Sequence, residues 1–262
     1  MSHFQPWDVN EPLGAGSIIA DTFNILFRNF LAVMIMGFFP SLAFIFLEAS
    51  IVSWDYALFD EADAGEVGFG LTILLIVLEV VLNGLITALL VQIAYDAKLG
   101  RPMTIGAYVN RTRAVIMPIF YVSIAVGILV GLGALALVLP GLWLLAVFYV
   151  AVPAVVMEEE HAMDAMERSS SLTKEYRWPI VGIIILMYIL VIGVALGGAA
   201  VIGLVVDAIG AGLLAHGVSA VFLSCVIALT SGFLAVSAAL VYARLRQIKE
   251  GVGVDELASV FE

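Results

Sequence analysis

The sequence predicts an all-α, polytopic membrane protein, with residues 1–262 forming a single integral membrane domain that has six transmembrane helices. Hydrophobic residues make up 63% of the chain and charged residues 13%, about half the charged share of a soluble domain. Six apolar runs approach or exceed the roughly 20 helical residues that cross a hydrocarbon core. All eleven Lys and Arg residues lie outside these runs. This composition excludes a soluble enzyme, a disulfide scaffold and a disordered chain.

The third and fourth runs are separated by a turn signal rather than by charge. Residues 114–157 contain no charged side chain. As one helix they would extend about 66 Å at 1.5 Å per residue, twice the thickness of the hydrocarbon core. Pro140 and Gly141 lie inside this stretch, and a Pro-Gly pair favours a turn, so we expect a tight helical hairpin there. The six predicted spans cover about residues 30–52, 69–95, 114–138, 141–157, 179–206 and 217–243.

The basic residues all fall on one side of the predicted spans. They precede the first span, lie between the second and third and between the fourth and fifth, and follow the sixth. Because basic residues near span ends are retained in the cytoplasm, both termini and residues 96–113 and 158–178 are predicted to be cytoplasmic. Residues 53–68 and 207–216 then face outward. The first outward connection is acidic, with Asp55, Asp60, Glu61, Asp63 and Glu66.

A short polar-ended segment with helical spacing precedes each odd-numbered span. Each segment opens with Ser, Thr or Asp, which can cap a helix start, and ends in Arg or Lys. The pattern predicts helices near the membrane plane over 17–28, 103–112 and 162–174, each followed by a helical hairpin. The residues expected to face the headgroup layer are Ile18, Phe23, Ile25, Leu26 and Phe27 in the first segment and Met163, Met166 and Leu172 in the third. The alternative is that cytoplasmic loops commonly carry capping residues and basic ends.

Four stretches of the chain form one motif: 139–143 (Leu-Pro-Gly-Leu-Trp), 152–158 (Val-Pro-Ala-Val-Val-Met-Glu), 165–169 (Ala-Met-Glu-Arg-Ser) and 172–174 (Leu-Thr-Lys). This motif resembles that of bacterial membrane proteins grouped with the membrane domain of glycerophosphoryl diester phosphodiesterases. The resemblance implies a bacterial inner-membrane protein with six helices and no established activity. Some relatives carry a fused phosphodiesterase domain. Here the chain ends thirteen residues after Lys249, so we expect neither that domain nor its activity.

Known catalytic and metal-binding motifs are missing from the sequence. No two of the histidines, His3, His161 and His216, are four residues apart, and no H-E-x-x-H, G-x-S-x-G or Walker motif is present. We therefore expect no enzyme activity, no metal and no cofactor. The acidic run 158–160 could hold a divalent cation, but neighbouring helical residues point in different directions. A solvated helix end is the favoured interpretation.

Glu79 is the deepest ionisable residue of the predicted spans and the candidate intramembrane polar site, together with Asn83 one helical turn further on. A charge near the bilayer centre costs at least ~2.5 kcal/mol, and no basic residue lies at matching depth. We therefore expect a protonated Glu79 carboxyl that faces the bundle and is hydrogen-bonded there. The site is either functional, as a proton, cation or lipid-headgroup site, or structural, as a link between helices.

Two classes of function remain open. The first is a non-enzymatic membrane protein that is lipid-interacting or serves as a scaffold. The alternative is a small-molecule or ion transporter that uses Glu79. Expected partners are membrane lipids, with a membrane-protein partner or a second copy left open. The net charge of −11 argues against nucleic acid. Glycine pairs at 127/131 and 193/197 are expected to pack helices inside the protein rather than between copies.

Overall fold

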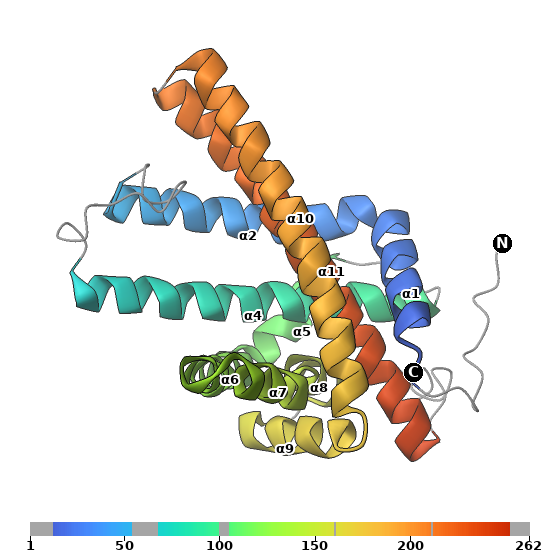
Figure 1. Ribbon diagram of the computed structural model, residues 1–262. Coiled ribbons are helices and arrows are strands. Elements are labelled where there is room, and N and C mark those ends of the chain that lie inside the picture. Colours follow the sequence, from blue (N-terminus) through green and yellow to red (C-terminus); the bar gives the residue numbers. More distant parts are fainter. Residues whose placement is uncertain (1–12, 54–67, 100–104, 160, 211, 252–262) are drawn as a thin grey trace.

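The computed structural model describes residues 13–53, 68–99, 105–159, 161–210 and 212–251. These residues are almost entirely helical, and no β-strand occurs among them, which confirms the all-α prediction (Figure 1). The helices are α1 (Ala15–Arg28), α2 (Phe30–Ile51), α4 (Phe69–Leu99), α5 (Ile105–Ala114), α6 (Ile116–Ala136), α7 (Val138–Phe148), α8 (Ala151–Glu158), α9 (Ala162–Thr173), α10 (Arg177–Ile209) and α11 (Leu213–Glu250).

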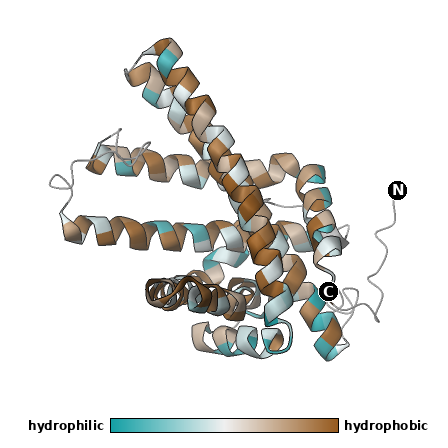
Figure 2. Cartoon of the chain, in the orientation of Figure 1, coloured by the Kyte–Doolittle hydropathy of each residue, from teal (hydrophilic) through white to brown (hydrophobic). Residues whose placement is uncertain are grey.

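Six segments within the described part of the chain are long and apolar enough to cross a membrane. They are α2, α4, α6, the combined α7–α8 segment, α10 and α11, as the hydropathy pattern predicts (Figure 2). The α10–α11 pair crosses α2 and α4 obliquely (Figure 1). At 38 residues, α11 extends about 57 Å, roughly twice the hydrocarbon thickness. One polar end of α11 therefore reaches beyond the apolar layer. The protein is a polytopic all-α membrane protein.

The predicted hairpin between the third and fourth spans is confirmed, but its turn lies before the Pro-Gly pair. Leu137 alone separates α6 from α7 and has extended backbone, with φ −168° and ψ 150°. Pro140 falls in the first turn of α7, where a missing N–H costs nothing. A Cβ atom on Gly141 would lie 2.8 Å from the backbone nitrogen of Ala134. Gly141 therefore serves the close approach of α6 and α7 rather than the turn itself.

The fourth span is broken at Tyr149 and Val150, between α7 and α8. Two hydroxyl groups of α9 compensate at the end of α7. The Ser169 Oγ donates to the Val147 carbonyl at 2.8 Å, and the Thr173 Oγ1 lies 3.2 Å from the same oxygen and 2.9 Å from the carbonyl of Ser169, between which its one hydrogen is shared. Both side chains are fully buried. The Ser and Leu-Thr positions of the motif thus hold α9 against the interrupted span.

The threefold unit of short helix and hairpin is present, and its three junctions share one backbone conformation. Asn29, Val115 and Tyr176 precede α2, α6 and α10 with φ/ψ of −113°/25°, −109°/18° and −115°/12°. These values lie at the edge of the bridge region, so none of the three short helices runs on unbroken into its span. In each unit, the junction carbonyl accepts from the amide four residues later, at 3.0 Å from Val33, Ile119 and Ile180.

Burial follows the same register in all three units. The residue seven positions before each junction is buried, and so is the residue four positions after it. Equivalent positions thus face the same interior, which is the signature of a structural repeat. The buried residues before the junctions are Thr22, Tyr108 and Ser169, and those after them are Val33, Ile119 and Ile180.

The prediction that α1 lays its apolar face into the headgroup layer is wrong for three of the five residues it named, whereas Phe27 is exposed. Ile18, Ile25 and Leu26 are at most 1% exposed, because α1 packs on α11 and on neighbouring helices. On α9, Leu172 is likewise buried, whereas Met163 is exposed. These short helices cover one end of the bundle. We call it the basic end, because the Arg residues of α1, α5, α9 and α11 lie there; the opposite end is the acidic end.

Helix α11 lies at the centre of the bundle and approaches α2 through glycine. A Cβ atom on Gly37 would lie 2.8 Å from the Cα of Ala228, and one on Gly232 would lie 2.7 Å from Cγ1 of Val33. Only glycine permits this spacing at the two contacts. The α2–α11 pair therefore ties the first hairpin to the last.

The expectation that the glycine pairs at 127/131 and 193/197 pack inside the protein is mostly wrong. No atom lies within 4 Å of a Cβ built on Gly131, Gly193 or Gly197. Gly127 alone meets a neighbour, with Cγ1 of Val80 at 3.2 Å. The glycines that make close contacts inside the described bundle do not follow the simple four-residue pattern. Each lies where one side chain or backbone segment of a neighbouring helix approaches too closely for a Cβ atom.

Candidate ligand cavity between three spans

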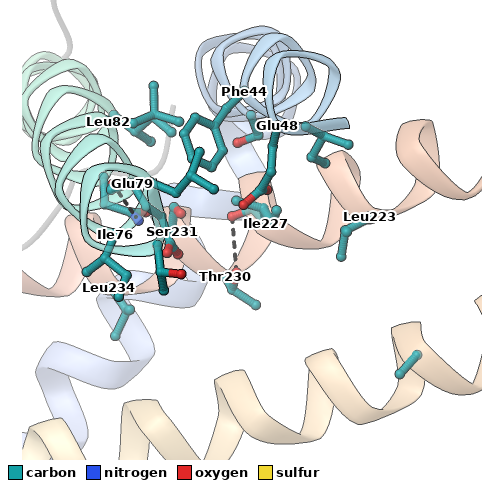
Figure 3. A pocket seen from close by; sticks show the side chains of 17 residues that line it. Phe44, Glu48, Ile76, Glu79, Leu82, Leu223, Ile227, Thr230, Ser231 and Leu234 are labelled. Atoms are coloured by element: carbon teal, nitrogen blue, oxygen red, sulfur yellow. Dashed lines mark hydrogen bonds between the residues drawn. The ribbon is translucent and has the colours of Figure 1, made fainter. Parts of the chain in front are cut away.

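A cavity of about 970 Å³ lies between α2, α4 and α11, with one residue of α10 at its edge. Figure 3 shows the side chains that line it: Phe44 and Glu48 come from α2, Glu79 from α4 and Thr230 from α11. The lining residues occupy the C-terminal half of α2 and the N-terminal half of α4. The cavity therefore belongs to the acidic half of the bundle.

The polar groups of the cavity are mainly hydrogen-bond acceptors. Ser41 donates its hydroxyl hydrogen to the carbonyl of Gly37 at 2.8 Å, and Thr230 donates to the carbonyl of Val226 at 2.9 Å. Both hydroxyl oxygens keep lone pairs available to a ligand. Two carboxylates, Glu48 and Glu79, also line the cavity. Since none of its described lining residues is Lys, Arg or His, the cavity is suited to a cationic or hydrogen-donating group.

Both residues of the sequence-predicted site, Glu79 and Asn83, line this cavity. The Asn83 amide nitrogen donates to the main-chain carbonyl of Glu79 at 3.1 Å, not to its carboxylate. This bond leaves the Asn83 side-chain oxygen as another acceptor. Both side chains are exposed rather than enclosed by protein. Protonation of Glu79 stays a prediction.

Glu48 is the site residue that the sequence pattern did not assign to the cavity. Glu48 lies near the end of the first span, where water reaches a carboxylate, so its position in the sequence predicts no role. Residue spacing within one helix cannot show that α2 places Glu48 and α4 places Glu79 around the same space. A usable signal was the set of hydroxyl side chains in otherwise apolar runs, at Ser41, Thr72 and Thr230, all of which line the cavity.

A buried apolar layer lies toward the basic end from the cavity. Leu26, Val33 and Met36 pack there with Phe233 and Leu90, and each is at most 5% exposed. Such packing excludes water. The cavity therefore does not continue through this layer, and any ligand enters from the acidic half.

The interpretation of the acidic run 158–160 as a solvated helix end is wrong for Glu158. This side chain is 16% exposed, and its Oε2 lies 3.0 Å from Nε of Arg168. Tyr242 of α11 also donates its hydroxyl to Glu158. Glu159 ends α8 in the left-handed conformation, with φ 54°. Glu160 lies outside the described residues.

Glu158 belongs to a cluster that joins three helices at the basic end. Arg246 lies 3.7 Å from Glu158 and 2.9 Å from Glu250, and Arg168 pairs with both acids. Burial alone would lower the pKa of Arg168, but the adjacent charges of Glu158 and Glu250 outweigh it and raise that pKa. The cluster therefore links α8 and α9 to α11 through charge-assisted hydrogen bonds.

Comparison with models of known protein families, with curated proteins and with solved structures returned no match. The assignment of a function therefore rests on the geometry of the chain itself.

Proposed function

We propose that this chain is a non-enzymatic, multi-pass protein of a bacterial inner membrane that binds a lipid or similar amphiphile by its cationic group. The observation that carries the proposal is the acceptor-rich cavity that contains both Glu48 and Glu79. Its volume of about 970 Å³ lies at the upper end of the range of small-molecule sites. The ligand's apolar part would contact Phe44 and Ile76, which line the same space.

The proposed orientation places the basic end in the cytoplasm. Its support is the one-sided distribution of all eleven basic residues. The inner-membrane location is supported by the resemblance to the glycerophosphoryl diester phosphodiesterase membrane-domain family. In this orientation the cavity lies in the outer half of the bilayer.

Electrostatics supports a cationic ligand. A carboxylate at membrane depth costs at least ~2.5 kcal/mol when charged and unpaired, and no described lining residue supplies a positive charge. An ammonium group placed beside Glu79 would offset that cost and would donate to the hydroxyl and amide oxygens that line the cavity. A neutral or anionic headgroup would leave a charged Glu79 uncompensated or repelled.

A binding experiment with matched amphiphiles tests this proposal. Binding of dodecylammonium and of uncharged dodecanol to the purified protein would be measured by the shift in thermal unfolding. We expect stabilisation by the ammonium compound alone. Glu79→Gln should weaken its binding about tenfold, since loss of one charge-assisted contact costs ~1.5 kcal/mol. Asp207→Asn, which removes a carboxylate that does not line the cavity, should leave binding unchanged.

A second arm distinguishes a lipid from a water-soluble amine. Methylammonium carries the same charged group without the chain. If it binds as tightly as dodecylammonium, the ligand is a small soluble amine. Equal binding of dodecanol, or an unchanged Glu79→Gln variant, would contradict a cation-binding cavity.

Transport through Glu79 is the second candidate function, because the cavity extends from Glu48 to Glu79, deep within the second span. Transport requires that the apolar layer of Met36 and Phe233 opens during the cycle. Flux of radiolabelled methylammonium into proteoliposomes would test it. Uptake that is lost in Glu79→Gln and kept in Asp207→Asn supports transport; binding without flux supports the first proposal.

A further inference from the structure

A second hollow lies on the opposite half of the bundle, between α6 and α9. It has a volume of about 870 Å³ and shares no lining residue with the Glu79 cavity. We call it the α6–α9 groove. Met117, Tyr121 and Ile128 line it from α6, and Met163 and Met166 line it from α9. Its walls are therefore almost entirely apolar.

The α6 wall of the groove has the length of one membrane leaflet. Met117, Tyr121, Ile124 and Ile128 are spaced by four, three and four residues, which places them on one helix face. From Met117 to Ile128 the helix rises about 16 Å. Half of a hydrocarbon core is about 15 Å. The groove thus matches a single acyl chain lying along α6.

One end of the groove is polar. Glu159, which ends α8, and His161, which immediately precedes α9, lie there. A carboxylate and an imidazole therefore border the end from which the apolar face begins. This arrangement complements a headgroup that carries both a phosphate and an ammonium group.

No described residue of the protein covers the groove. Met117 is 62% exposed, Tyr121 59% and Met163 75%. Helix α9 meanwhile packs on the bundle through other residues, including the buried Ala165 and Leu172. At this depth of a membrane the surrounding medium is hydrocarbon, so acyl chains are available to fill the hollow and water is not.

We infer that the α6–α9 groove is a binding site for one phospholipid of the leaflet at the basic end, with a zwitterionic ethanolamine-type headgroup whose ammonium group contacts Glu159 and whose phosphate contacts His161. The inference does not depend on the Glu79 cavity. The α6–α9 groove is apolar with a polar end formed by Glu159 and His161, whereas the Glu79 cavity is acidic and rich in hydrogen-bond acceptors.

Native mass spectrometry of the protein released from nanodiscs tests this site. The nanodiscs contain equal amounts of phosphatidylethanolamine and phosphatidylglycerol with identical acyl chains. The parent should retain one phospholipid, with ethanolamine preferred. Ala125→Trp places a large side chain in the groove, and the retained lipid should be lost. Leu132→Trp, an exposed position one turn beyond Ile128 that does not line the groove, should keep it.

Further variants keep the test decisive. Met163→Trp narrows the groove from α9 at an exposed position, so it checks the result if Ala125→Trp does not fold. Glu159→Gln combined with His161→Ala should keep the lipid but abolish the preference for ethanolamine. Glu79→Gln should change nothing, which separates this site from the proposed function. A parent that retains no phospholipid, or groove variants that retain as many as the parent, would overturn the inference.

Discussion

At the residue scale, the interrupted fourth span depends on two hydroxyl groups from another helix. The carbonyl of Val147 lies at the end of α7 and accepts from Ser169, while Thr173 shares its one hydroxyl hydrogen between this carbonyl and that of Ser169. A carbonyl inside a membrane has no water to bind. The break at Tyr149 and Val150 is therefore tolerated because α9 supplies the missing donors.

We expect removal of both donors to destabilise the protein more than removal of one. Ser169→Ala should lower the free energy of unfolding by about 1 kcal/mol, and the double variant with Thr173→Ala by ~1–3 kcal/mol, because the carbonyl is then left without its donors. Thermal unfolding in detergent measures this. Ser171→Ala, an exposed serine on the same helix, is the control and should leave stability unchanged.

Glu158 is the second residue with a definite role, as the acid shared by α8, α9 and α11. Glu158→Gln removes the charge that Arg168 and Arg246 share and weakens the bond from Tyr242. We expect a loss of ~1–3 kcal/mol in the free energy of unfolding. Thermal unfolding at low and high salt would report it. An equal loss from Glu159→Gln, at the exposed neighbour, would contradict a specific role for Glu158.

At the scale of elements, the contact between α2 and α11 depends on two glycines that the sequence pattern did not select. Gly37 faces the backbone of Ala228, which cannot move aside without shifting a helix. Gly197 on α10, by contrast, faces open space. Helix packing in a membrane depends on such close contacts because lipid tails are as apolar as the side chains.

Gly37→Val should therefore lower the free energy of unfolding by about 1–3 kcal/mol, the usual cost of overpacking. Gly197→Val adds the same side chain where nothing opposes it and should be tolerated. The comparison uses thermal unfolding of both variants in one detergent. Equal stability of the two variants would show that α2 and α11 can separate at no cost.

At the scale of the whole molecule, the basic and acidic ends define one topology. In a Cys225→Ala background, which removes the single cysteine, a cysteine replaces either Gly212 or Glu167. Both positions are exposed, near opposite ends of the bundle. With a membrane-impermeant maleimide on intact cells, we expect labelling at position 212 alone. Position 167 should react only after permeabilisation, and the reverse pattern would refute the proposed orientation.

The candidate site was predictable only in part. Glu79 and Asn83 could be named from the sequence, because an ionisable group in an apolar run is costly and therefore conspicuous. Glu48 could not, since it lies close to a span end where carboxylates need no special explanation. The cavity itself arises from the way α2, α4 and α11 come together, which no single helix specifies.

The sequence by itself determined the number of spans, their approximate bounds and the threefold unit, since each follows from hydrophobic length, charge placement and local spacing along one helix. Tertiary structure decided which faces those helices bury. It turned Ile18 and Leu26 toward the protein rather than the lipid, drew Glu158 into an ion-pair cluster and placed Glu48 beside the Glu79 cavity. The physical reason is that in a membrane an apolar face is equally compatible with lipid and with another helix. Hydrophobicity alone therefore cannot assign the face, and complementary side-chain shapes and polar partners do.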